Sequence, residues 1–410
     1  MEKHILVLTT TSDFLSKFER ENVKLLQQRG YTVHYAANMN EPHYLSDRER
    51  IEQMGVQIHP IEIARSPFLL SNNKQALEQV VRLVRQYAIS VIHCHTPVGG
   101  VVGRLAGRLC RDRPVVIYTA HGFHFYREAP LFNHLVYYQV EKQLARYTDI
   151  LIVINEEDYR NAQRFRLRRG GRLYKIPGVG LDTNVFRPLS DEQRRQRREE
   201  LKIPQEAFFL LSVGELNENK NHKVILEALS RMRRQGQDLS SIRYGICGDG
   251  FYRDRITRWI VEMGLKDVVT LYGYCRDVPR ILGCADALAF PSRREGLGMA
   301  GLEALAMGVP VLAADNRGTR EYMWPGKNGF VCPYDDVDGF IRGIERLRGQ
   351  TDRQREEMRA CCRESVRPFG KTYAIAAMRR IYTEVDRRIE QAGDERQGDS
   401  QYSAGRIQPR

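Results

Sequence analysis

Short runs of apolar residues alternate with amphipathic stretches along most of the chain. The runs at 5–8 and 115–118 are typical of buried strands, whereas residues 73–87 and 98–110 carry apolar side chains at helical spacing. Such alternation predicts strand–helix–strand units that feed a parallel sheet. We therefore expect an α/β protein.

The alternation comes in two series, each of which predicts a doubly wound, Rossmann-like domain. The predicted strands lie at 5–8, 32–36, 90–93, 115–118, 150–153, 208–213, 242–247, 268–271, 287–290 and 309–313. The predicted helices lie at 18–29, 73–87, 98–110, 221–235, 252–263, 299–307, 336–348, 353–366 and 371–391. No apolar periodicity marks the polar stretch between the two series, so we expect an interdomain linker there.

These patterns give a complete set of expected domain boundaries. The expected order is a first domain at 1–187, a linker at 188–204, a second domain at 205–370, a C-terminal helix at 371–392 and a polar, disordered tail at 393–410. The C-terminal helix is long enough to return to the first domain.

Composition narrows the class of partner. The 410 residues include 64 Lys and Arg against 51 Asp and Glu, a net charge of +13 that predicts an anionic partner: nucleic acid, phospholipid headgroups or a phosphorylated small molecule. No apolar run approaches the roughly 18 residues that span a bilayer, so any membrane contact is expected to be peripheral. The 8 cysteines have neither Cys-x-x-Cys nor small-domain disulfide spacing, which is typical of reduced thiols in the cytoplasm.

The strongest chemical signal lies at residues 290–310. A predicted strand ends at a proline turn, Gly296 and Gly298 let backbone N–H groups approach an anion, and a predicted helix follows. Glu295 precedes that helix, and Glu303 lies about 7 Å along its axis. Two carboxylates flanking an anion site suit a ligand with hydroxyls on both sides of a phosphate; a helix cap plus a surface glutamate is the plain alternative.

This segment resembles the Glu-x7-Glu signature of glycosyltransferase family 4, retaining enzymes of the GT-B fold, in which two Rossmann-like domains face an interdomain cleft. The resemblance covers the chain from residue 5 to about 382. Residues 93–100, 118–126, 176–180 and 212–216 are most similar to capsular and exopolysaccharide transferases.

The resemblance implies roles for individual residues. Glu295 is expected to bind hydroxyls of the transferred sugar, Glu303 the ribose diol, and His121 the donor sugar. Lys220 matches the lysine that neutralises the diphosphate, and a fixed cation stabilises the charge that the leaving group gains. We therefore expect His121, Lys220 and Glu295 to be catalytic. The remaining expected donor-binding residues are Gly214, Gly248, Asp249, Gly250, Arg276, Gly296, Leu297, Gly298 and Met299.

Two positions depart from the family pattern. The family usually has an arginine five positions before the lysine, but this chain has Glu215, which we expect to turn away from a diphosphate. The frequent glycine pair after the first strand is replaced by residues 9–13, whose hydroxyl and N–H groups can substitute for glycine. Within that loop, we expect Thr11 and Ser12 to lie on the acceptor side.

His93 and His95 alternate, which places them on one face of an extended segment. A metal site needs further ligands that the sequence does not identify, so we expect neither a metal nor a cofactor, and an acceptor-side role for His95. The segment 335–338, rich in aspartate, is interpreted as a helix N-cap.

Arginines cluster between residues 160 and 172, and aromatic residues between 125 and 138. Much of the arginine charge is expected on one helix face. These stretches can lie against anionic lipid, each cation contributing about 1 kcal/mol, or can be an ordinary solvated surface. Either arrangement suits an acceptor whose lipid tail stays in the membrane.

The favoured interpretation is a retaining glycosyltransferase that moves a sugar from a nucleotide donor, with UDP the expected nucleotide, to a lipid-linked saccharide. It is expected to act in capsular or exopolysaccharide biosynthesis, in the cytoplasm and peripherally on the inner face of the cell membrane. One alternative is a UDP-sugar 2-epimerase. Another is a basic nucleic-acid-binding protein, but no zinc finger, aromatic RNA-binding motif or recognition helix is evident, so no nucleic-acid partner is expected.

Overall fold

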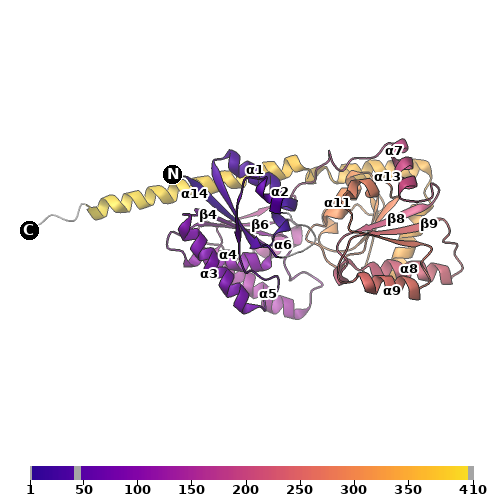
Figure 1. Ribbon diagram of the computed structural model, residues 1–410, viewed down its shortest axis with the longest axis horizontal. Coiled ribbons are helices and arrows are strands. Elements are labelled where there is room, and N and C mark those ends of the chain that lie inside the picture. The colour runs from indigo at the N-terminus through magenta and orange to yellow at the C-terminus, as the bar shows by residue number, and fades with distance from the viewer. Residues whose placement is uncertain (1, 41–47, 405–410) are drawn as a thin grey trace, which may run out of the picture. The chain divides into compact units, whose positions relative to one another are not determined.

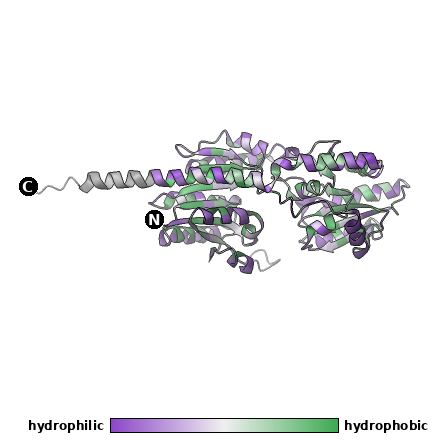
Figure 2. Ribbon diagram, turned by 90° about the horizontal axis from the view of Figure 1, so that it is seen from above, coloured by the Kyte–Doolittle hydropathy of each residue, from purple (hydrophilic) through white to green (hydrophobic). Residues whose placement is uncertain are grey.

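The computed structural model describes residues 2–40 and 48–404. The chain divides into two compact units, which we call the first unit (Met1–Val179 and Thr372–Arg410) and the second unit (Gly180–Lys371) (Figure 1). Each unit is a parallel α/β sheet covered by helices. Hydrophobic residues concentrate in the strands, and hydrophilic residues are frequent on the outer helices (Figure 2).

The first unit contains a 7-stranded parallel sheet in the order β3-β2-β1-β4-β5-β6-β7. Its strands are β1 (Lys3–Thr11), β2 (Tyr31–Asn38), β3 (Gln57–Pro60), β4 (Val91–His95), β5 (Val115–Ala120), β6 (Ile150–Val153) and β7 (Arg172–Lys175). The order reverses between β1 and β4. In an open parallel sheet, ligands bind outside the carboxyl ends of the strands at such a switch point.

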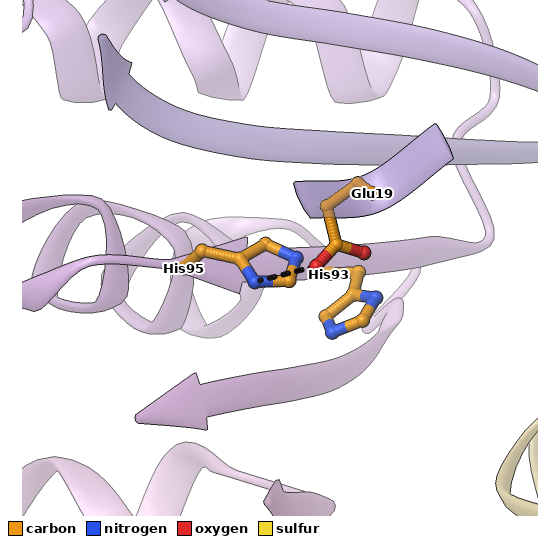
Figure 3. Close-up of side chains that lie close together, drawn as sticks. All are labelled: Glu19, His93 and His95. Atoms are coloured by element: carbon orange, nitrogen blue, oxygen red, sulfur yellow. Dashed lines mark ion pairs between the residues drawn. The ribbon is translucent and has the colours of Figure 1, made fainter. Parts of the chain in front are cut away.

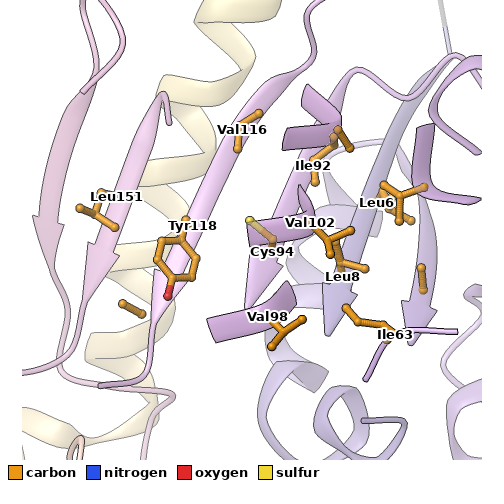
Figure 4. Packing of buried hydrophobic residues seen from close by; sticks show 14 of the residues in the cluster. Leu6, Leu8, Ile63, Ile92, Cys94, Val98, Val102, Val116, Tyr118 and Leu151 are labelled. Atoms are coloured by element: carbon orange, nitrogen blue, oxygen red, sulfur yellow. The ribbon is translucent and has the colours of Figure 1, made fainter. Parts of the chain in front are cut away.

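The helices of the first unit bury one face against this sheet. They are the π-helix η1 (Leu15–Glu19), α1 (Arg20–Gln28), α2 (Arg48–Glu52), α3 (Leu70–Gln86), α4 (Pro97–Leu109), α5 (Leu131–Leu144), the 3-10 helix η2 (Ala145–Tyr147), α6 (Glu156–Ala162) and α14 (Lys371–Ala404). Val102 of α4 packs with Leu6, Ile92 and Val116 of the central strands in one buried cluster (Figure 4). This core fixes the ends of β1, β4 and β5.

The second unit contains a 6-stranded parallel sheet in the order β10-β9-β8-β11-β12-β13. Its strands are β8 (Phe208–Val213), β9 (Ile242–Cys247), β10 (Val269–Gly273), β11 (Ala287–Phe290), β12 (Val311–Ala314) and β13 (Gly329–Cys332). Its helices are α7 (Asp191–Glu200), η3 (Glu218–Lys220), α8 (His222–Arg234), α9 (Arg253–Glu262), α10 (Val278–Leu282), α11 (Met299–Ala306), η4 (Thr319–Glu321), α12 (Val337–Arg348), α13 (Asp352–Ser365) and η5 (Arg367–Phe369). The switch point lies between β8 and β11.

The segment expected as an interdomain linker, 188–204, belongs to the second unit, as do residues 180–187 of the expected first domain. It contains α7, which begins at a capping box formed by Ser190 and Gln193. Apolar periodicity is absent because the helix is anchored by a buried arginine, Arg198, whose Nη2 donates to Asp286 Oδ2 at 2.7 Å.

The last helix, α14, packs on the first unit. Asp386 accepts hydrogen bonds from Lys3 Nζ at 3.1 Å, Arg29 Nη2 at 2.6 Å and the Tyr31 hydroxyl at 2.7 Å. The backbone is helical to Ala404, so residues 393–404 of the expected disordered tail extend this helix, whereas 405–410 lie outside the described residues. Among the described helices, none is long and apolar enough to cross a membrane.

Candidate functional site

The loop from β11 to α11, residues 291–298, carries the strongest sequence signal and is held by neighbouring loops. Asn219 Nδ2 donates to the Arg294 carbonyl at 3.0 Å, and Asn221 Nδ2 donates to the Pro291 carbonyl at 3.1 Å. From the loop after β12, the buried Arg317 donates through Nε to the Glu295 carbonyl at 3.2 Å. The backbone that carries Glu295 is therefore fixed from two sides.

Lys220 and Glu295, 75 residues apart in sequence, form an ion pair of 2.6 Å between Nζ and Oε1. Their side chains are 20% and 14% exposed, so the pair is only partly screened by water. Lys220 Nζ also lies 5.3 Å from the centroid of the Phe290 ring. A Cβ added to Gly214 would lie 3.0 Å from Lys220 Cε, so the glycine gives the lysine its path across the end of β8.

Glu303 projects from α11 near the same lysine. Burial raises the pKa of its carboxyl to about 7, and the charge of Lys220 opposes that rise. Within the described part of the chain, no hydrogen-bond donor contacts this carboxylate. This carboxyl group receives no hydrogen bond and lies close to a cation at the end of the sheet. It can therefore accept hydrogen bonds from hydroxyl groups of a ligand.

The N-terminus of α11 begins at Gly298, which has a left-handed φ of 88°. A Cβ at this position would lie 2.8 Å from the Phe290 ring, so only glycine fits both the conformation and the space. No side chain caps this terminus; the Gly301 N–H donates to the Gly298 carbonyl at 3.0 Å, and the N–H groups that begin a helix otherwise have no intrahelical acceptor. Gly296, Leu297 and Met299 place their backbone in this turn, which suits an anion.

The turn after β9 lies against the end of β8. A Cβ on Gly248 would overlap the Gly214 carbonyl at 1.8 Å, which shows how closely the two predicted glycines approach. Asp249 next to it accepts from Arg253 Nη1 at 3.1 Å and from the Gly250 N–H at 2.8 Å. The structure thus joins this turn to the Lys220 loop.

Within the described structure, Arg276 and Glu215 are not tied by side-chain hydrogen bonds or ion pairs to the other residues of the predicted donor site. Arg276 is exposed in the loop after β10, the edge strand of the sheet, two strands away from β8. Glu215 is partly buried, and within residues 2–40 and 48–404 we find no ion pair for it. Asn219, Asn221 and Arg317, in contrast, were not predicted, because an asparagine or arginine in a loop has no local signature of its contacts.

The first unit places His121 and His95 together at the carboxyl ends of β5 and β4. His95 Nδ1 lies 3.1 Å from His121 Nε2, and the Phe14 ring lies against both imidazoles, with centroids 5.2 and 5.0 Å away. Burial lowers the pKa of His121 to about 4 and that of His95 well below its ordinary value. Both rings are therefore neutral at pH 7.

Glu19, which sequence reasoning did not single out, joins these histidines from η1. Its buried Oε1 lies 3.6 Å from His95 Nδ1, and burial raises its pKa to about 7 (Figure 3). Possible metal-ligand atoms of Glu19, His93 and His95 lie within 4.8 Å of one another, so the fold supplies a third candidate ligand.

His93 is already engaged through both ring nitrogens. Nδ1 lies 3.2 Å from the Tyr382 hydroxyl, and Nε2 lies 2.9 Å from Thr119 Oγ1. Within the described residues, the hydrogen bonds of His93 thus run to Tyr382 and Thr119, while His95 contacts His121 through Nδ1 and its buried Nε2 has no partner.

Thr11 and Ser12 lie at the end of β1 on the same edge of the sheet. Their carbonyls accept hydrogen bonds from the Tyr35 hydroxyl at 2.9 and 3.1 Å, and Thr9 Oγ1 also donates to the Thr11 carbonyl at 2.9 Å. The side-chain hydroxyl groups of Tyr35 and Thr9 thus hold this turn.

The predicted basic helix face is wrong, because α6 ends at Ala162 and most of the arginines follow it in turns. Arg168 Nη1 pairs with Asp149 at 2.8 Å, and Arg160 pairs with Glu156 at 3.1 Å. The exposed feature of this region is α5 instead, where Leu131 is 81% and Leu135 72% exposed. The arginines in the turns at 163–171 are Arg164, Arg166, Arg168 and Arg169.

Comparisons with known proteins agree with this geometry. Residues 193–364 match the family described as glycosyl transferases group 1, and residues 4–155 match the family described as glycosyl transferase 4-like. A putative glycosyltransferase EpsD of Bacillus subtilis (strain 168) is 39% identical over 349 residues, which cover 85% of this chain and 88% of the relative. A UDP-Gal:alpha-D-GlcNAc-diphosphoundecaprenol alpha-1,3-galactosyltransferase of Escherichia coli is 28% identical over 68% of this chain and 71% of its own.

Solved structures share the architecture at lower identity. Anabaena Alr3699/HepE in complex with UDP and glucose has a TM-score of 0.75 at 17% identity, covering 93% of this chain and 100% of its own. Sucrose-phosphate synthase from Thermosynechococcus elongatus also has a TM-score of 0.75, at 18% identity, and covers 93% and 99% of the two chains. At this identity the likeness establishes the fold, which is GT-B. An uncharacterized 41.2 kDa protein in the cps region of Klebsiella pneumoniae is 24% identical over 74% of this chain and 81% of its own. The chain thus belongs to glycosyltransferase family 4, a family of retaining enzymes.

Proposed function

We propose that this enzyme transfers a sugar from a UDP-sugar to a hydroxyl of a lipid-linked saccharide, with retention of configuration, in exopolysaccharide or capsule synthesis. The observation that carries the proposal is the Lys220–Glu295 pair of 2.6 Å beside the partner-free carboxyl of Glu303. The name of the Escherichia coli relative includes UDP-Gal and a diphosphoundecaprenol acceptor, and HepE is described with bound UDP-glucose.

On the donor side, Lys220 stabilises the negative charge that the diphosphate gains as the glycosidic bond breaks. Glu295 holds that ammonium group in place and accepts hydrogen bonds from hydroxyls of the transferred sugar. Glu303 accepts hydrogen bonds from the ribose hydroxyls. Backbone N–H groups in the first turn of α11 donate hydrogen bonds to phosphate oxygens. Because the leaving phosphate can accept the acceptor proton itself, no side-chain base is required.

His121 contacts the transferred sugar in this proposal. When His95 donates from Nδ1, His121 accepts at Nε2 and carries its own proton on Nδ1. A neutral imidazole with this tautomer donates one hydrogen bond to a sugar hydroxyl without adding charge. His95, Thr11 and Ser12 form the acceptor-side edge of the same sheet.

The acceptor side involves the membrane surface. Leu131 and Leu135 of α5 lie one helical turn apart and are mostly exposed, as is Phe132 at 55%. The exposed cations Lys142 and Arg146 follow at the other end of this region. We propose that this face rests peripherally on anionic lipid at the inner face of the cell membrane, where a lipid-linked acceptor is anchored.

Calorimetric titration with UDP, GDP, ADP and a short DNA duplex tests the proposed binding of a UDP-sugar donor. We expect selective UDP binding that weakens at least tenfold in Glu303→Gln and is unchanged in the control Glu357→Gln, an exposed glutamate on α13. Binding to DNA alone would favour the nucleic-acid-binding alternative.

Vesicle flotation tests the proposed contact of α5 with anionic lipid. The double variant Leu131→Ser and Leu135→Ser should lose binding to vesicles that contain phosphatidylglycerol while it keeps its affinity for UDP. The control changes Val261 of α9, an apolar residue of the second unit that is 49% exposed, to serine. Equal flotation of the α5 variant and the wild type would reject this role for α5.

A further inference from the structure

The second unit contains a pocket of about 350 Å³ at the amino-terminal ends of its strands. Ser241 precedes β9, Asp286 precedes β11 and Pro310 precedes β12, and all three line the pocket. The loops that carry Lys220 and Glu295 follow the opposite, carboxyl ends of β8 and β11. The pocket is therefore separate from the donor-binding residues.

The lining is strongly basic. Arginines enter from α7, from the end of α12 and from α13, and the acidic residues of the lining are Glu206 and Asp286. Three positive charges are left without an acidic counterpart in the lining. The arginines are Arg194, Arg198, Arg348, Arg355 and Arg359.

Two of these arginines form short ion pairs that stabilise the fold, whereas two others form only long ones. Arg194 and Arg198 each donate to a different oxygen of Asp286 at 2.7 Å. Arg355 and Arg359, in contrast, make only longer ion pairs with neighbours on α13, at 3.5 Å to Asp352 and 3.9 Å to Glu356. The guanidinium groups of Arg355 and Arg359 are therefore available to a ligand.

A second observation is independent of charge. The Oγ of Ser241 is buried at the pocket wall and has no hydrogen-bond partner in the described structure. A buried hydroxyl normally finds a partner, and a ligand oxygen supplies one once the Ser241 side chain turns toward the pocket. An arginine fork and a hydroxyl together match the oxygens of a phosphate group.

We propose that this pocket binds a small molecule with two or more linked phosphate groups, at a site distinct from the donor site. Its volume suits a compact ligand, and the excess of three charges suits an oligophosphate better than a single carboxylate. The same chemistry is present in free condensed phosphates and in nucleoside triphosphates.

Calorimetry on the full-length protein tests the site with tripolyphosphate as the probe, at about 150 mM salt so that distant charges are screened. Saturating UDP is present throughout to fill the donor site. The variant Arg355→Ala/Arg359→Ala should bind at least tenfold more weakly than the wild type. The control Arg353→Ala/Arg363→Ala removes the same charge from α13 outside the pocket and should change affinity less than twofold.

Two results would overturn the proposal: no heat from tripolyphosphate at 1 mM in the presence of UDP, or equal losses in the two double variants. Ser241→Ala, which leaves the charge unchanged, should also weaken binding, and wild-type affinity in that variant would contradict the assigned hydroxyl contact. A parallel titration with ATP separates the two sources, since binding tighter than that of tripolyphosphate identifies a nucleotide and equal or weaker binding a free condensed phosphate. Unchanged melting temperatures of all variants show that the fold is intact.

Discussion

The carboxyl of Glu303 should make nucleotide binding depend on pH. Its pKa is raised by burial to about 7, and only the ionised form accepts hydrogen bonds from both ribose hydroxyls through both oxygens. With that pKa, the ionised fraction falls from about 0.9 at pH 8 to about 0.1 at pH 6. UDP affinity should therefore fall about tenfold over this range, which corresponds to about 1.4 kcal/mol.

Calorimetry at pH 6, 7 and 8 measures this slope, and Glu303→Gln is the matched control because its amide does not titrate. UDP has a phosphate that also titrates near pH 6, so the relevant quantity is the difference between the slopes of the wild type and the variant. Parallel slopes would refute the assignment of Glu303 to the ribose.

The same raised pKa has a consequence for the nucleotide-free protein. A carboxyl whose folded-state pKa exceeds its unfolded value stabilises the fold at low pH and loses that contribution as pH rises through the folded pKa. The melting temperature of Glu303→Gln relative to the wild type should consequently be higher at pH 8 than at pH 5, measured by scanning calorimetry. A constant difference between the two proteins would contradict the raised pKa.

Further variants test the remaining parts of the site. Lys220→Met leaves Glu295 without its cation and should lower kcat by about 100-fold or more with a smaller change in KM; a raised KM with unchanged kcat would mean that the lysine only binds substrate. Gly298→Ala should destabilise the protein by about 1–3 kcal/mol, because alanine fits neither the left-handed φ nor the space beside the aromatic ring, as measured by urea unfolding; wild-type stability would show that the turn can relax. Glu19→Gln should lower kcat while UDP affinity is kept, because it alters the contact of Glu19 with His95, which in turn contacts His121; unchanged kcat in a transfer assay would assign the glutamate to folding alone.

Most of the fold follows from the sequence because the central strands are continuous apolar runs buried on both faces. The strands that the pattern did not predict are β3, β7 and β13, each at the edge of a sheet. β3 and β7 mix polar with apolar side chains that stay partly exposed, so their hydrophobic signal is weak. The helix α7 was missed for a different reason, since its anchor is the guanidinium group of Arg198.

The candidate site was predictable where one local segment holds its chemistry, as in the turn from β11 to α11. The residues that contact this segment were harder to predict from the sequence. Nothing near Glu19 in sequence indicates that η1 will bring its carboxylate to His95, and the contact of Arg317 with the Glu295 carbonyl depends on how β12 ends. Such contacts arise from the order of strands in the sheet, which local patterns do not encode.

A transfer assay tests directly whether the enzyme is a retaining transferase that uses a UDP-sugar. The purified enzyme is incubated with single UDP-sugars and a diphosphoundecaprenol-linked saccharide, and the anomeric configuration of the product is read by NMR. We expect a product that keeps the configuration of the donor sugar and forms only when acceptor is present. Inversion would contradict the retaining mechanism, and interconversion of UDP-sugars without acceptor would identify an epimerase instead.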